Sequence, residues 1–183
     1  MKLNLIAVSF SLMLFFAVSG SAQKQKIESL YSDLNTKVCK TIEQSDEGTG
    51  SYRGECKGIG GYKLQVTEGD IRQSIDVIAP NKKKFELDLI GNVSTAFSSV
   101  GEKAEWRVTR KGKTITPTAL IVRYNTSENP DDSSKLTSYL VVAKITKNEI
   151  CITDVIKPAA NANEEARKLA DASVAKPCKV PAN

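Results

Sequence analysis

The feature that most constrains the fold is an alternation of apolar and polar residues that recurs through most of the chain. In residues 62–66, for example, Tyr62, Leu64 and Val66 alternate with polar side chains. This period of two is typical of strands with one buried face. Further strands are expected at residues 71–77, 85–89, 103–109, 114–125, 136–146 and 149–155. Turn residues separate these runs, which favours an antiparallel sheet, a sandwich or a half-open barrel of about eight strands.

The run TALIVRY at residues 118–124 is apolar on both faces, which is typical of a central strand covered on both sides. A C-terminal helix over residues 163–173 is the expected cover on one side. Asn161 followed by Glu164 resembles a capping box, and Pro177 would stop the helix. The domain is therefore expected to be α+β.

Two elements are expected before the first alternating run. Ile27, Leu30, Tyr31 and Leu34 have the spacing of one helix face, which predicts a short amphipathic helix over residues 24–34. Residues 38–42 and 51–57 flank a polar connector and could pair as a hairpin.

Four cysteines, an even number, predict two disulfides. Four cysteines allow three connectivities. The spacing favours Cys39 with Cys56 and Cys151 with Cys178, because each pair closes a short loop around a local element. The first bond would also fix the register of the hairpin.

The N-terminus has the pattern of a secretory signal peptide, residues 1–22, with a basic start, an apolar centre and small residues before Gln23. The apolar stretch at residues 5–18 is too short to span a bilayer, and no later run is longer. The expectation is a single exported domain, residues 23–183, in the periplasm or the medium, with no transmembrane span. Its net charge would be about +4, which favours anionic envelope surfaces or acidic partners over nucleic acid.

The chain contains no histidine. Catalytic triads with histidine, histidine metal ligands and histidine acid–base catalysis are therefore excluded. No phosphate-binding glycine loop or zinc-type cysteine spacing is present, so we expect no cofactor and no metal. A calcium ion at Asp131 and Asp132 stays an open alternative, although the loop lacks the ligand spacing of an EF-hand.

Arginine alternates with acidic residues in two expected strands. Asp70 and Arg72 flank an isoleucine, and Glu105 and Arg107 flank a tryptophan, so each pair lies on one strand face. Arg123 lies inside the apolar run and needs a partner, for which Glu105 or Asp70 is expected. These five residues are the candidate ligand-binding residues, although cross-strand ion pairs that fix the register are the favoured interpretation.

The string EWR at residues 105–107, the segment PTALIVRY at residues 117–124 and the run CKGIGGY at residues 56–62 resemble small exported bacterial proteins with no assigned activity. The resemblance covers about half of the mature chain. It implies a bacterial envelope location and a β-rich fold, and it implies no mechanism.

Function remains open between three hypotheses. The preferred one is a non-enzymatic binding protein, such as an inhibitor or a ligand-capture module, whose partner is an envelope protein, a polysaccharide or an anionic surface. The first alternative is a hydrolase of envelope polysaccharide that uses the carboxylates of Glu68, Asp70 and Glu105. The second is adhesion to an anionic surface through basic turns, at residues 82–84 and 110–113 with Arg107.

Overall fold

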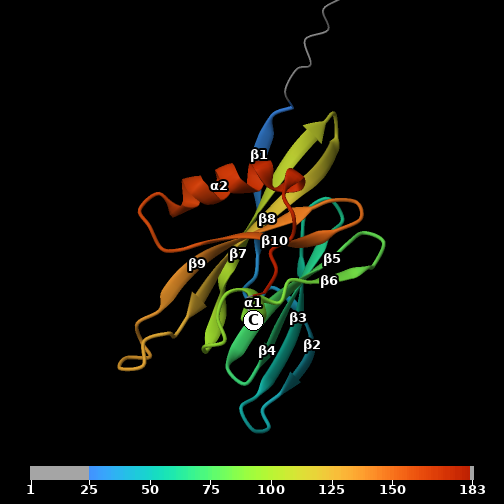
Figure 1. The fold of residues 1–183 in the computed structure, drawn as a ribbon. Helices are drawn as coiled ribbons and strands as arrows, with labels where there is room; N and C mark the ends of the chain where they lie inside the picture. Colours follow the sequence, from blue (N-terminus) through green and yellow to red (C-terminus); the bar gives the residue numbers. More distant parts are fainter. Residues whose placement is uncertain (1–24, 182–183) are drawn as a thin grey trace, which may run out of the picture.

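The computed structural model describes residues 25–181, so the expected signal peptide lies outside the described residues. Within this range the chain forms ten strands and two α-helices (Figure 1). The strands are β1 (Ile27–Asp33), β2 (Lys40–Ser45), β3 (Ser51–Lys57), β4 (Lys63–Gly69), β5 (Arg72–Ile78), β6 (Lys84–Glu86), β7 (Ser98–Lys111), β8 (Thr114–Thr126), β9 (Thr137–Ile145) and β10 (Ile150–Ile156). The helices are α1 (Leu89–Asn92) and α2 (Ala162–Ala172), and a 3₁₀ turn, Ser173–Ala175, follows α2.

All ten strands belong to one sheet with the order β10-β9-β8-β7-β5-β4-β3-β2. Strand β6 pairs with β5, and β1 pairs with β7. Neighbouring strands are antiparallel except β5 and β7, which meet in a single parallel pairing of Arg72 with Ser98. The mainly antiparallel sheet predicted from the alternation is confirmed, with ten strands where about eight were expected.

The predicted N-terminal helix over residues 24–34 is wrong, because residues 27–33 form strand β1. This strand pairs with β7 from Ile27 opposite Thr109 to Asp33 opposite Lys103. It also places Ser32 where its hydroxyl accepts a hydrogen bond from Trp106 Nε1 at 3.0 Å. As a helix, the segment would leave the edge of β7 unpaired, so the tertiary context overrides the local helical spacing.

The larger hydrophobic core lies on one face of the sheet, which bends so that β3, β4 and β5 share this core with strands β7 to β10. Trp106 and Tyr124 are completely buried in it. The ring of Tyr62 packs against Trp106 at a centroid distance of 6.0 Å. Leu87 and Leu89 are buried there too, but the strand expected at residues 85–89 ends at Glu86 and α1 begins at Leu89.

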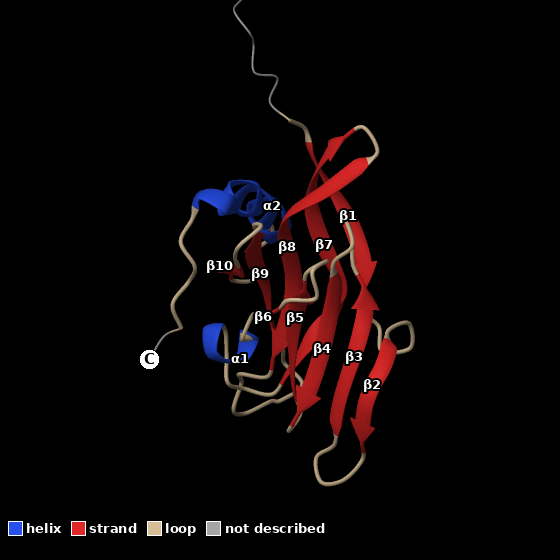
Figure 2. Cartoon of the chain, turned by 90° about the vertical axis from the view of Figure 1, so that its right-hand side faces the viewer, coloured by secondary structure: helices blue, strands red, loops and turns tan. Residues whose placement is uncertain are grey.

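Helix α2 covers the other face of β8 and β9 and lies on the far side from β2, β3 and β4 (Figure 2). Ala162, Ala166 and Ala170 are buried against Ile121 and Leu140. The predicted C-terminal helix is confirmed, as is the helical cover over the central strand β8. The side chain of Asn161 makes no capping hydrogen bond, so the expected capping box does not form.

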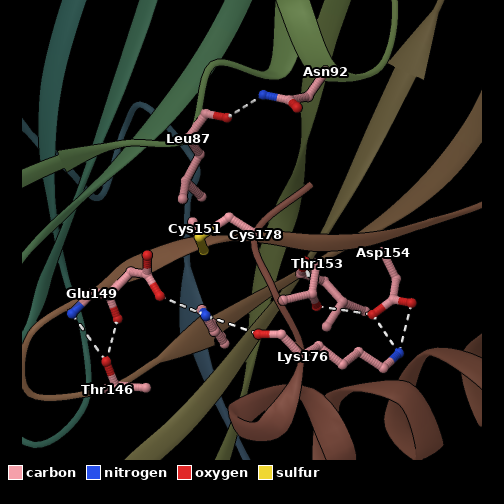
Figure 3. The surroundings of a disulfide bond; sticks show 11 residues. Leu87, Asn92, Thr146, Glu149, Cys151, Thr153, Asp154, Lys176 and Cys178 are labelled. Carbon is pink, nitrogen blue, oxygen red and sulfur yellow. Dashed lines mark hydrogen bonds and ion pairs between the residues drawn. A yellow bond between two sulfur atoms is a disulfide. The ribbon is translucent and has the colours of Figure 1, made fainter. Parts of the chain in front are cut away.

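Both disulfides have the favoured connectivity, Cys39 with Cys56 and Cys151 with Cys178. The second bond fastens the segment after α2 to β10 (Figure 3). Lys176 reinforces this link, because its Nζ lies 2.7 Å from Asp154 Oδ1 and its carbonyl accepts a hydrogen bond from Lys144 Nζ. The backbone amide of Lys179 also donates to the carbonyl of Ile152. The end of α2 is thus held by covalent, ionic and backbone contacts.

Candidate functional site

A polar stripe runs along α2 beside its buried alanines. Asn163, Arg167 and Asp171 are spaced four residues apart, so they lie on one face of the helix. This face looks toward β7 and β8, where Glu105, Arg107 and Arg123 point away from the large core.

Each residue of the stripe contacts a side chain of β7 or β8, and Arg167 also donates to the hydroxyl of Tyr31 on β1 at 3.5 Å. Arg107 donates two hydrogen bonds to Asp171, at 2.6 and 2.9 Å. Arg167 donates two to Glu105, at 2.7 and 3.1 Å. We call these contacts, together with the one between Arg123 and Asn163, the helix–sheet ladder. Two of its three steps are bidentate ion pairs, which combine charge with fixed geometry.

The middle of the ladder is well shielded from solvent. The side chains of Glu105 and Arg107 are only 12 % and 10 % exposed. Ser29 of β1 lies between them: its hydroxyl donates to Glu105 and accepts from Arg107. Glu105 is therefore fully partnered by groups from β1, β7 and α2.

The pKa of Glu105 reflects this partnering. Burial by itself would raise it, but the hydrogen bonds from Arg167 and Ser29 and the charges of Arg167 and Arg107 outweigh burial and lower the pKa. The hydrogen bond from Arg107 to Asp171 likewise raises the pKa of Arg107. Both groups are held in their charged forms.

A cleft of about 240 Å³ lies beside the Asn163 end of the ladder, between α2 and the sheet. Ile121 and Leu140 provide its apolar lining. Tyr31 of β1, which is 52 % exposed, forms another part of the wall. A ligand in this cleft would meet both hydrocarbon and an aromatic ring.

The charges around the cleft are unbalanced. Lys103, Arg123 and Arg167 line it with three positive charges, and Glu105 contributes the single carboxylate. That carboxylate is already engaged by Arg167. The cleft therefore attracts an anionic group.

Arg123 is the distinctive residue of the cleft. Its guanidinium donates to Ser138 Oγ at 2.9 Å and to Asn163 Oδ1 at 3.3 Å, and both acceptors are neutral. The other arginines of the chain each lie within ion-pair distance of a carboxylate: Arg53, Arg72, Arg107, Arg110 and Arg167. The predicted partner of Arg123, Glu105 or Asp70, is wrong.

The five candidate residues from the sequence divide into two groups. Glu105, Arg107 and Arg123 come together beneath α2. Asp70 and Arg72 lie elsewhere, at the turn between β4 and β5. There Arg72 pairs with Asp70 and lies 4.8 Å over the ring of Phe97.

Sequence reasoning missed the helix side of the site. Asn163, Arg167 and Asp171 were not singled out, although their spacing of four residues next to the alanine stripe was a usable signal. Tyr31 was missed because its segment was expected to be a helix. The pairing of β1 with β7 is what brings Tyr31 opposite Glu105.

The carboxylates proposed for hydrolysis do not share a cavity. Glu105 lines the cleft beneath α2, and neither Glu68 nor Asp70 lines that cleft. Glu68 accepts a hydrogen bond from Gln73 at 2.6 Å, and Asp70 is at an exposed turn. The two acids that a glycosidase needs on either side of a substrate are therefore not paired here.

Arg107 does not join the basic turns at residues 82–84 and 110–113 in an exposed surface. Trp106 is fully buried, and Arg107 is covered by α2. Lys84 pairs with Asp76, while Lys83 lies 4.5 Å over the ring of Phe85. These charged residues act as separate local contacts.

At two possible cation sites, the potential ligand atoms form other contacts within the protein. In the loop after β8, Asp132 accepts hydrogen bonds from Ser134 and pairs with Lys135. Among the described residues one group of potential ligand atoms is close enough for a metal, at Glu149, Cys151 and Cys178, but its sulfur atoms form the disulfide shown in Figure 3. In the same part of the chain, no helix is long and apolar enough to span a membrane.

The chain matches no protein-family model, and comparison with curated proteins and with solved structures finds no match to either.

Proposed function

We propose that this protein is an exported, non-enzymatic binding protein that captures a ligand through an anionic group held at Arg123. The observation that carries the proposal is the bonding of Arg123, which has only neutral acceptors in a cleft with surplus positive charge. A guanidinium matches the geometry of carboxylate, sulfate and phosphate oxygens. An anion at this point would complete the third step of the helix–sheet ladder.

The other residues that line the cleft indicate the chemistry of the rest of the ligand. Ile121 and Leu140 offer hydrocarbon contact, and Tyr31 offers a ring with a polar tip. A compact ring that carries a carboxylate, such as a uronic acid, fits these properties. The volume of about 240 Å³ suits a group of that size rather than the surface of a folded protein, so ligand capture is favoured over protein inhibition.

Export is supported by two features. All four cysteines are joined in disulfides, which persist in oxidising compartments. The first 22 residues have the layout of a signal peptide.

The polysaccharide hydrolase is not favoured by the chemistry of Glu105. A general acid needs a pKa raised toward the working pH, whereas the arginines around Glu105 lower its pKa. The carboxylate of Glu105 has a structural role, and we propose that it positions Arg167 and Arg107.

The proposal is tested by titrating the oxidised mature protein with glucuronate and following backbone amide shifts by NMR. Arg123→Gln should weaken binding by about ten- to a hundredfold, since a hydrogen bond to a charged group is worth about 1.5–3 kcal/mol. Shifts of the native protein should map to β7, β8 and the first turns of α2.

Arg53→Gln is the matched control. It removes the same charge from an exposed arginine that pairs with Glu43 on the β2–β3 hairpin, outside the cleft, and should leave binding unchanged. Equal binding by native protein and Arg123→Gln, or shifts confined to other strands, would refute the proposal.

A further inference from the structure

Tyr31 connects the cleft beneath α2 to a second hollow on the far side of β1. This second hollow has a volume of about 380 Å³ and is also lined by Val38 and Lys57. Val38 and Lys57 in turn line a third hollow, of about 420 Å³, that extends to Lys40 and Tyr62. Tyr31 lines both the first and the second hollow, and Val38 and Lys57 line both the second and the third, so the three hollows are neighbours along the surface. We call the second and third hollows the β1–β3 groove.

The groove has a rigid base. The disulfide between Cys39 and Cys56 lines it and joins the start of β2 to β3. Both cysteines are buried in the large core. The base of the groove is therefore fixed before a ligand binds, which reduces the entropy cost of binding.

Positive charge continues along these hollows. Lys40 and Lys57 are exposed, and neither has a carboxylate within ion-pair distance among the described residues. Lys63, by contrast, is paired with Glu55 at 2.6 Å. With Lys103 and Arg123 in the cleft, each of the three hollows has at least one cation without a carboxylate partner, while Asp33 adds one carboxylate to the second hollow and Glu55 one to the third.

Aromatic rings alternate with these charges. Tyr31 stands between the cleft and the second hollow, and Tyr62 lines the third. Tyrosine presents an apolar ring face together with a hydroxyl that can donate and accept hydrogen bonds. Such rings fit flat, hydroxyl-rich sugar units better than they fit the side chains of an acidic peptide.

We propose that the ligand is an acidic polysaccharide, with one uronic acid unit bound at Arg123 and the following units bound along the β1–β3 groove. The inference rests on the proposed function for its first subsite and adds the chain-like nature of the ligand. A carboxylated glycan is the ligand class, because lysines and tyrosines recur in the walls of the hollows and a uronic acid polymer repeats both a charge and a ring.

The test compares galacturonate with a galacturonate oligomer of about six units by isothermal titration calorimetry. Linked subsites raise the affinity without any change in the first contact, so the oligomer should bind at least about a hundredfold more tightly than the monomer. A double variant, Lys40→Gln with Lys57→Gln, should weaken the oligomer about tenfold and leave the monomer unchanged.

The controls separate this inference from the proposed function. Lys111→Gln with Lys113→Gln removes the same charge from the β7–β8 turn and should change neither affinity. Arg123→Gln should weaken monomer and oligomer alike. Equal affinities for native protein with monomer and oligomer would refute the groove while the cleft stands, and no binding of either would refute both.

Two further ligands test the chemical class. A neutral maltose oligomer of the same length should bind at least about tenfold more weakly than the acidic one, because it has no carboxylates to pair with the lysines. A glutamate peptide of the same charge should also bind more weakly, because it has no sugar rings for Tyr31 and Tyr62. A peptide that binds as tightly as the acidic glycan would overturn the assignment.

Discussion

At the scale of single residues, the turn between β4 and β5 holds unfavourable backbone conformations. Asp70 and Ile71 have φ angles of 50° and 57°, in the left-handed region. Aspartate tolerates this region, whereas a β-branched residue such as isoleucine adopts it rarely. The side chain of Ile71 is 52 % exposed, so little burial compensates for the conformation.

Ile71→Gly should therefore stabilise the protein. Relief of the left-handed strain, about 1–2 kcal/mol, exceeds the added flexibility of glycine in the unfolded chain, about 0.5–1 kcal/mol. We expect the free energy of unfolding to rise by about 0.5–1 kcal/mol in urea denaturation. Ile71→Val keeps the branched side chain and should give no such gain. A loss of stability in the glycine variant would mean that contacts of the isoleucine outweigh its strain.

Glu105 should make stability depend on pH. Its pKa in the folded protein is lowered from the usual 4.5. The unfolded chain therefore binds more protons between the two pKa values, and the stabilisation, complete above about pH 4.5, is lost as the pH falls through the folded pKa.

Glu105→Gln should lower the free energy of unfolding by about 1–3 kcal/mol near neutral pH, because Arg167 and Arg107 lose a charged acceptor. The difference between native protein and variant should shrink as denaturation is repeated from about pH 6 to about pH 3. A difference that stays constant over this range would show that Glu105 titrates normally in the folded state.

At the scale of elements, the attachment of α2 depends on the segment that comes after the helix. The bond between Cys151 and Cys178 closes a loop of 27 residues that contains the whole helix. Asp154 holds the same tail through the side chain of Lys176, as Figure 3 shows, and Lys144 holds it through the carbonyl of Lys176. The helix itself contributes three small buried alanines and the partly buried Leu169 to its interface, so its apolar burial is modest.

Replacing both Cys151 and Cys178 by serine should lower the free energy of unfolding by about 3–4 kcal/mol in the loop-entropy account. The rate of amide hydrogen exchange should in addition increase more in α2 than in β4 and β5, because the helix loses its anchor. The corresponding change at Cys39 and Cys56, which enclose no part of α2, should leave the helix protected. Unchanged exchange in α2 would show that the ladder alone holds it.

For some elements, the sequence pattern alone is enough to predict the secondary structure. The hairpin of β2 and β3, strands β4 and β5 and helix α2 were predicted because each has one periodic face and clear turn residues at its ends. Residues 27–34 fit two patterns equally well. One is the spacing of a helix face, and the other is a strand that places Leu30, Ser32 and Leu34 toward the core. Only the free edge of β7, a distant segment, selects the strand.

At the scale of the whole molecule, the candidate site depends on which strands are neighbours. Alternation assigns Arg72 and Glu105 each to a strand face but does not say how β5 lies against β7. The backbones of these strands pair only at Arg72 and Ser98, at the start of β7, whereas Glu105 lies further along β7, opposite Tyr31. The partners Arg167 and Asp171 come from a helix that follows all of the strands, so no local pattern could have linked them to Glu105 and Arg107.

The disulfide behind α2 has a consequence for when the protein can act. The cleft has one wall on the sheet and one on the helix, and the helix is anchored through Cys178. A newly made chain in a reducing cytoplasm has this anchor open, so its Arg123 faces a loosely held wall. For the binding function and the export proposed above, capture would then begin only after the bond between Cys151 and Cys178 has formed outside the cytoplasm.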